Sequence, residues 1–159
     1  MDSLILHTFS GRRFMPDQET INRAREDARE GKSPSTQAGE FVREEIHHIR
    51  EGKHGAASPK QAIAIGLSKA RRAGVKLPPP KGSASLQKKA EQDEEAGESP
   101  RHRVSRSRSR ATERALQREP SSSASKSALS RQAKSAAAKR SKSARSSAAT
   151  RAARTRKGR

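Results

Sequence analysis

Three stretches in the first half of the chain repeat apolar residues at the three- to four-residue spacing of an α-helix. They are residues 17–30, 36–51 and 61–73. A glycine follows each stretch directly, which is common just past the end of a helix. The third stretch is the clearest, because Ser58 can cap it, Pro59 suits a first helical position and Gln61 can complete a capping box. The pattern predicts a small head of two or three short helices.

The rest of the chain has no such pattern. Residues 83–100 are acidic and of low complexity, and from Arg101 onward the chain is mostly Ser, Ala, Lys and Arg. Only 29% of the residues are hydrophobic and 2% aromatic, which is too little apolar surface to offset an ordering cost of about 1–2 kcal/mol per residue. The expected fold class is therefore mostly disordered with a small all-α N-terminal head. The expected organisation is a disordered leader (1–16, with Met15 as an alternative start to Met1), a helical head (17–76), a Pro-rich then acidic linker (77–100), and a disordered basic tail (101–159).

The formal net charge of +19 is concentrated in the tail. Residues 1–100 carry 17 Lys/Arg against 15 Asp/Glu, a net +2, whereas residues 101–159 carry 19 against 2, a net +17. Such a charge density calls for a polyanionic partner, with nucleic acid ahead of an anionic membrane. No aromatic residue follows Phe41, so base stacking is unavailable and contacts are expected at phosphates.

The candidate nucleic-acid-binding residues fall into two groups. Those in the tail are Arg106, Arg108, Arg110, Lys139, Arg140, Lys142, Arg145, Arg151, Arg154, Arg156, Lys157 and Arg159. A secondary group on the third predicted helix is Lys60, Lys69, Arg71 and Arg72.

Other kinds of chemistry find little support. The chain has no Cys and no apolar run near the roughly 20 residues of a membrane span. It also lacks a phosphate loop, a nucleophile elbow and a zinc-protease pair, so we expect neither an enzyme, a cofactor nor a small-molecule substrate. Glu44 and Glu45 each precede a histidine by three residues, a spacing used in metal-binding helical bundles. Without carboxylates from other core helices, a solvated polar face with no metal is predicted, and His54 is expected on a loop surface.

Two stretches carry a family resemblance. They read RAREDAREGKSPSTQAGEFVREEI from Arg23 and GAASPKQAIAIGLSKARRAGV from Gly55. With them, the region from Ile21 to Pro80 resembles a bacterial family of small basic proteins labelled as DNA-binding or plasmid-stabilisation proteins. The tail is similar in composition to bacterial linker-histone-like tails, although no proline follows Pro120. The resemblance implies a histone-like, nucleoid-associated protein of the bacterial cytoplasm.

The predicted function is sequence-tolerant DNA binding through the tail, in nucleoid compaction or plasmid maintenance. Two alternatives remain open: an RNA- or ribosome-associated protein, and an adaptor whose head binds a protein partner. DNA is expected ahead of RNA. The acidic stretch Glu91–Glu98 is a candidate to fold onto the tail and to compete with DNA for the tail's positive charges. A homodimer through the head would be one way to bury the aliphatic residues Val42, Ile49, Ile63 and Leu67.

Overall fold

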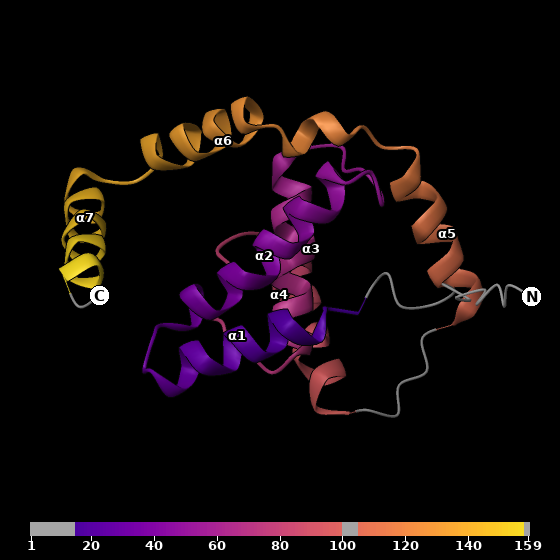
Figure 1. The fold of residues 1–159 in the computed structure, drawn as a ribbon, viewed down its shortest axis with the longest axis horizontal. Coiled ribbons are helices and arrows are strands. Elements are labelled where there is room, and N and C mark those ends of the chain that lie inside the picture. Colours follow the sequence, from indigo (N-terminus) through magenta and orange to yellow (C-terminus); the bar gives the residue numbers. More distant parts are fainter. Residues whose placement is uncertain (1–14, 100–104, 158–159) are drawn as a thin grey trace, which may run out of the picture.

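The computed structural model of the protein describes residues 15–99 and 105–157 (Figure 1). Within these ranges all of the regular secondary structure is helical, and there is no strand. The elements are α1 (Gln18–Arg29), α2 (Pro34–Arg50), α3 (Pro59–Arg72), α4 (Ala84–Glu98), α5 (Arg106–Gln117), the 3-10 helix η1 (Ser121–Ala124), α6 (Lys126–Ala138) and α7 (Lys142–Lys157). None of the helices in the described residues is long and apolar enough to cross a membrane.

Helices α1 to α4 form the head. The most extensive contact is between α2 and α3, while α1 packs on α2 and α4 packs on α3. Two apolar clusters join α1, α2 and α3, and neither of them includes a residue of α4. Phe41 is fully buried in the first cluster, and Ile49 in the second. Burying a side chain of this size stabilises the fold by about 1.5–3 kcal/mol, so these two residues anchor a core otherwise built largely from alanine.

A glycine lets the two central helices approach closely. A Cβ atom at Gly66 of α3 would lie 2.7 Å from the Cα atom of Val42 in α2, a distance that real Cβ atoms do not tolerate. Ala62 of the same helix is also buried, whereas Ala73 at its end is exposed.

The third helix begins and ends as its sequence predicts. The Ser58 hydroxyl accepts a hydrogen bond from the Gln61 amide at 3.2 Å, and the Gln61 side chain accepts one from the Ala57 amide at 2.6 Å. At the other end, the amide of Val75 donates to the Ala70 carbonyl at 3.0 Å, and the Val75 side chain is buried. Ser58 therefore caps α3, the Gln61 side chain closes on the amide that precedes the cap, and Val75 provides the apolar closure.

The prediction of a mostly disordered chain is wrong. The stretch expected to be an acidic linker forms α4, and the part of the basic tail that the structure describes forms α5, η1, α6 and α7. The expectation of intrinsic disorder is corrected with it. Residues 1–14, which make up most of the expected leader, lie outside the described residues, as do 100–104 and 158–159.

The tail is helical because of its local composition. Alanine, arginine and lysine are among the best helix formers, even where no apolar stripe is present. Serines also stand where helices begin: the hydroxyls of Ser125 and Ser141 accept hydrogen bonds from the amides of Ala128 and Ala144, each at 3.2 Å. Neither helix propensity nor serine capping depends on the buried apolar area, so both can order a segment that has little of it.

The described part of the chain after α4 meets the head around the loop between α2 and α3. The amides of Gly55 and Ala56, in the loop between α2 and α3, donate to the carbonyls of Leu116 and Pro120 at 2.8 and 3.2 Å. Ala124 of η1 is fully buried in the second apolar cluster. From there α6 and α7 lead away from the head toward the C-terminus (Figure 1). We call η1, α6 and α7, residues 121–157, the basic arm.

Candidate nucleic-acid interface and buried charge cluster

The basic arm carries positive charge alone. No Asp or Glu occurs from Ser121 to the C-terminus, whereas 12 Lys and Arg residues do. Every lysine and arginine of the arm within the described residues is exposed. Apart from Arg151, which has an interaction, these side chains make no hydrogen bond or ion pair in the described part of the chain. Their charges are therefore available to a partner.

Most of the predicted tail contacts fall on exposed helical surface. Arg108 and Arg110 lie on α5, and Lys139 and Arg140 lie in the turn between α6 and α7. Six more lie on α7, which is roughly 24 Å long at 1.5 Å per residue. These six are Lys142, Arg145, Arg151, Arg154, Arg156 and Lys157. Arg159 and the side chain of Arg106 lie outside what the structure describes.

The secondary candidates on α3 are placed differently. Lys69 and Arg71 are buried, and Arg72 pairs with Asp93 of α4 at 2.8 Å. Arg71 Nε lies 3.9 Å from Glu94 Oε1, which also belongs to α4. Only Lys60 among the four is exposed with no ion pair to another described residue. Three of these cations therefore hold the head together. For Arg71 and Arg72 the sequence conceals this role, because their acidic partners lie in the stretch interpreted as a linker.

Asp93 is the main anchor of α4. Its side chain accepts hydrogen bonds from the Ser68 hydroxyl at 2.6 Å, from Arg72 Nε at 2.9 Å and from Lys89 Nζ at 2.6 Å. Burial by itself raises the pKa of the Asp93 carboxyl, but these hydrogen bonds outweigh burial and hold the pKa below its usual value. The acidic stretch therefore folds onto the head through α3 instead of onto the basic tail.

We expect Asp93→Asn to lower the free energy of unfolding by about 1.5–3 kcal/mol, the usual contribution of hydrogen bonds to a charged group. Because folding lowers the pKa of Asp93, its contribution is fully present above the unfolded value of about 3.9 and is lost as the pH falls through the folded value. Urea unfolding at neutral and acidic pH measures both effects. Glu98→Gln is the matched control, because Glu98 and its partner Lys76 are exposed. An equal loss in both variants would contradict the anchoring role.

A buried cluster of charges joins α2 to α3. Lys69 Nζ lies 2.7 Å from Glu45 Oε2 and 3.6 Å from Glu44 Oε1. All three side chains are at most 6% exposed. The expectation of a solvated polar face at Glu44 and Glu45 is therefore wrong, because α3 and the loop after α2 cover it.

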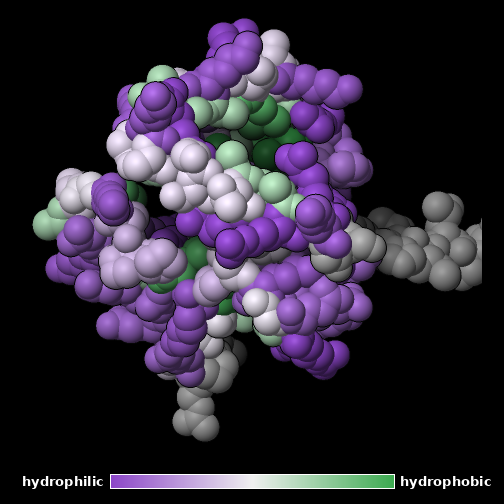
Figure 2. Space-filling model, turned by 90° about the vertical axis from the view of Figure 1, so that its left-hand side faces the viewer, coloured by the Kyte–Doolittle hydropathy of each residue, from purple (hydrophilic) through white to green (hydrophobic). Residues whose placement is uncertain are grey.

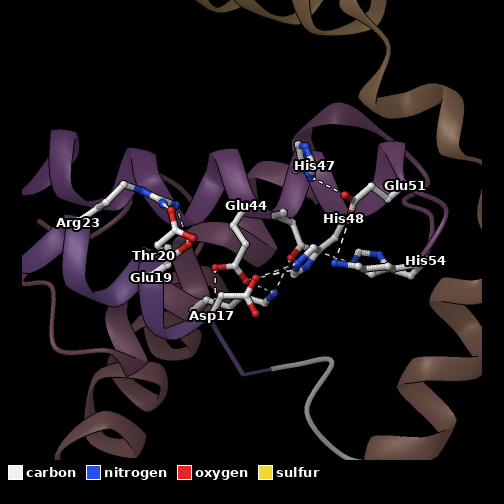
Figure 3. A network of polar contacts seen from close by, with 12 residues as sticks. Asp17, Glu19, Thr20, Arg23, Glu44, His47, His48, Glu51 and His54 are labelled. Carbon is white, nitrogen blue, oxygen red and sulfur yellow. Dashed lines mark hydrogen bonds and ion pairs between the residues drawn. The ribbon is translucent and has the colours of Figure 1, made fainter. Parts of the chain in front are cut away.

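Two histidines complete this cluster (Figure 3). His48 Nε2 lies 3.5 Å from Asp17 Oδ2, and His54 Nε2 lies 3.2 Å from Glu45 Oε1. The edge of one imidazole ring points at the face of the other, and the ring centroids are 6.5 Å apart. His54 is 8% exposed, so its predicted place on a loop surface is wrong. The cause is the docking of α5 and η1 over that loop, which no local sequence pattern reveals.

Burial lowers the pKa of His48. Lys53 and Lys69 lower the pKa further, while Glu44 raises it by a smaller amount. The neutral imidazole is therefore favoured, and a neutral ring has a nitrogen lone pair available to a hydrogen-bond donor or a metal ion.

The outer surface is hydrophilic over most of the face that Figure 2 shows, with small separate hydrophobic patches. A hollow of about 390 Å³ lies between α2 and α6. Its lining includes the apolar residues Val42, Ile46 and Leu129 together with Arg43 and Arg50. Val42 is partly buried and Ile49 fully buried within this one chain. A second copy is therefore not needed to cover Ile49, and dimerisation through the head stays a prediction.

Fold and site together define an all-helical protein with a buried cluster of charges and histidines and an exposed basic arm. Residues 33–81 match a family described as a family of unknown function (DUF6496). The match covers less than half of the chain; it takes in α2, α3 and the loop between them but not the basic arm. Comparisons with curated proteins and with solved structures gave no significant match. The family description names no activity, so the DNA-binding and plasmid-stabilisation labels remain predictions.

Proposed function

We propose that the protein binds duplex nucleic acid, DNA in the first instance, through phosphate contacts made by the basic arm. The observation that carries the proposal is the set of exposed lysines and arginines on α6, on α7 and in the turn between them, ten of which have no partner among the described residues. Cations that an internal acid has already neutralised release few counterions from DNA. Cations without partners release counterions freely, and this release drives sequence-independent binding.

The head supports the proposal by contrast. Residues 1–100 carry a net charge of only +2, and three of the four basic side chains singled out on α3 are held by acids of α2 or α4. Nearly all of the attraction to a polyanion therefore comes from the arm and from α5. Since phosphates are alike in every sequence, this mode of binding has little sequence preference and suits compaction of DNA.

The salt dependence of binding gives a quantitative test. Each neutralised phosphate contributes a slope of about −0.9 to the plot of log affinity against log salt concentration. We expect replacement of Lys142, Arg145, Arg154 and Lys157 by glutamine to make that slope less steep by about 3–4. Fluorescence anisotropy of a labelled DNA duplex over a range of salt concentrations measures it.

A matched variant removes the same charge from the head. It replaces Arg25, Arg29, Lys60 and Lys81, which are exposed and unpaired among the described residues. This control is expected to leave the slope almost unchanged, and an equal loss in the two variants would contradict the proposal. Substitution is preferable to a chain ending at Pro100, because that chain would lose Ala124, which is buried in the second apolar cluster. Tighter binding to an RNA duplex of the same length would assign the arm to RNA instead.

A further inference from the structure

Three metal-ligating side chains meet at the end of α2. Glu45 and His48 are three residues apart and so lie on one face of the helix. His54 reaches them from the loop that follows, and Figure 3 shows His48 lying between Glu44 and Asp17 on one side and His54 on the other. One ligand atom from each of Glu45, His48 and His54 lies within 4.8 Å of the others, and all three residues are buried.

The tautomer of His54 is fixed by its backbone neighbour. Its Nδ1 atom lies 3.0 Å from the Gly55 carbonyl oxygen, and because a carbonyl can only accept, Nδ1 must carry the hydrogen. In a neutral ring the Nε2 atom then has a lone pair, and that lone pair faces Glu45 Oε1 at 3.2 Å. Two acceptor atoms that face each other at this distance in a buried site are placed to share a metal ion between them.

The other contacts of Glu45 favour a metal ion. Neither of its carboxylate oxygens receives a hydrogen bond of good geometry in the described part of the chain. Oε2 is balanced by Lys69 at 2.7 Å, which leaves Oε1 as the atom that faces His54. His48 adds a second imidazole, and the Asp17 carboxylate lies 3.5 Å from its Nε2 atom. A carboxylate beside a ligating histidine is a common outer partner in metal sites.

We propose that Glu45, His48 and His54 form a zinc site. Two imidazoles and one carboxylate are a ligand set that zinc accepts, with a further position open to water. Two ligand atoms about 2.0–2.1 Å from a tetrahedral zinc ion lie about 3.3–3.4 Å apart, close to the separation of Glu45 Oε1 and His54 Nε2.

The buried charges of the cluster leave room for a further cation. Glu44 and Glu45 are two buried carboxylates, and Lys69 is the one ammonium group buried beside them in the described part of the chain. Bound zinc would tie the end of α2 to the loop on which α5 and η1 dock, and so would help to hold the basic arm against the head.

Zinc titration of the metal-free full-length chain in competition with a chromophoric chelator tests the proposal. We expect one zinc ion per chain and a higher melting temperature with zinc than without it, because a ligand that binds the folded state stabilises it. His54→Gln and Glu45→Gln are expected to weaken zinc binding by at least about 100-fold, more than the loss of an outer partner. The matched control is His47→Gln, which alters an exposed histidine on the same helix.

A second control replaces His7 and His102, which lie outside the described residues, with glutamine. The site is supported if these controls bind zinc as the wild type does, and if the imidazole nitrogen signals of His48 and His54 shift on zinc addition. The nitrogen signals require no variant, so they remain informative if His54→Gln fails to fold. Failure of the wild type to bind zinc stoichiometrically would overturn the proposal, as would binding that survives in His54→Gln and is lost in either control.

Discussion

Replacing Lys69 with methionine is expected to lower the free energy of unfolding by about 3–5 kcal/mol, the usual cost of removing one partner from a buried ion pair. Lys69 is 5% exposed, and its ammonium group is the closest cation to Glu45 among the described ion pairs. Methionine keeps an unbranched side chain that is one heavy atom shorter and removes the ammonium group. Urea unfolding, followed by circular dichroism in the presence of a metal chelator, measures the loss without compensation by a bound ion.

Two further variants identify the cause of that loss. Lys76 also pairs with a glutamate, but both side chains are exposed, so Lys76→Met is expected to have little effect because exposed pairs contribute little. The double variant Glu45→Gln, Lys69→Met removes one charge of each sign and is expected to recover part of the lost stability. A small effect of Lys69→Met, similar to that of Lys76→Met, would show that the buried cluster does not depend on this lysine.

The first three helices could be predicted because each carries its own local signals. Apolar spacing locates α1, α2 and α3 to within two residues at each end, and Ser58, Gln61 and Val75 mark the two ends of α3. These signals depend only on neighbours in the sequence. The same is true of the charge of the basic arm, so its candidate phosphate contacts follow from composition alone.

The remaining structure depends on partners that are distant in the sequence. Asp93 is 21 residues from its partner Arg72. Arg50 Nε donates a hydrogen bond at 2.8 Å to the carbonyl oxygen of Ala124, which is 74 residues away in the sequence. Without these partners α4 looks like a charged linker and η1 like part of a disordered tail. The available signals were weak: serines at the starts of helices, and Leu116, an isolated apolar residue in a polar segment.

The buried cluster is the clearest example of this limit. The spacing of Glu45 and His48 is visible in the sequence, but the third side chain, His54, stands in a glycine-rich loop with no pattern of its own. Its burial follows from the crossing of α5 and η1 over that loop. A metal site that combines one helix with one loop can therefore be proposed only when the covering segment is known.

That crossing leads to the second large effect. A Cβ atom at Gly55 would lie 1.8 Å from the carbonyl oxygen of Glu119 and 2.3 Å from its carbonyl carbon. Both are backbone atoms, so no side-chain rotation relieves the clash. We expect Gly55→Ala to displace the crossing segment and to lower the free energy of unfolding by about 2–4 kcal/mol, from overpacking and from the exposure of Leu116. Urea unfolding measures the loss of stability.

Amide hydrogen exchange locates the change. The Ala56 amide donates to the Pro120 carbonyl at 3.2 Å, so its protection reports whether the second half of the chain is docked. Gly39→Ala is the matched control: Gly39 is an exposed residue of α2 with no other atom within 4 Å of the added carbon. There alanine should stabilise the helix by about 0.5–1 kcal/mol. Unchanged protection of Ala56 in Gly55→Ala would mean that this contact does not fasten the arm. If the Ala56 amide loses its protection while the affinity for DNA is retained, the arm binds phosphates through its charge alone and needs the head only to set its position.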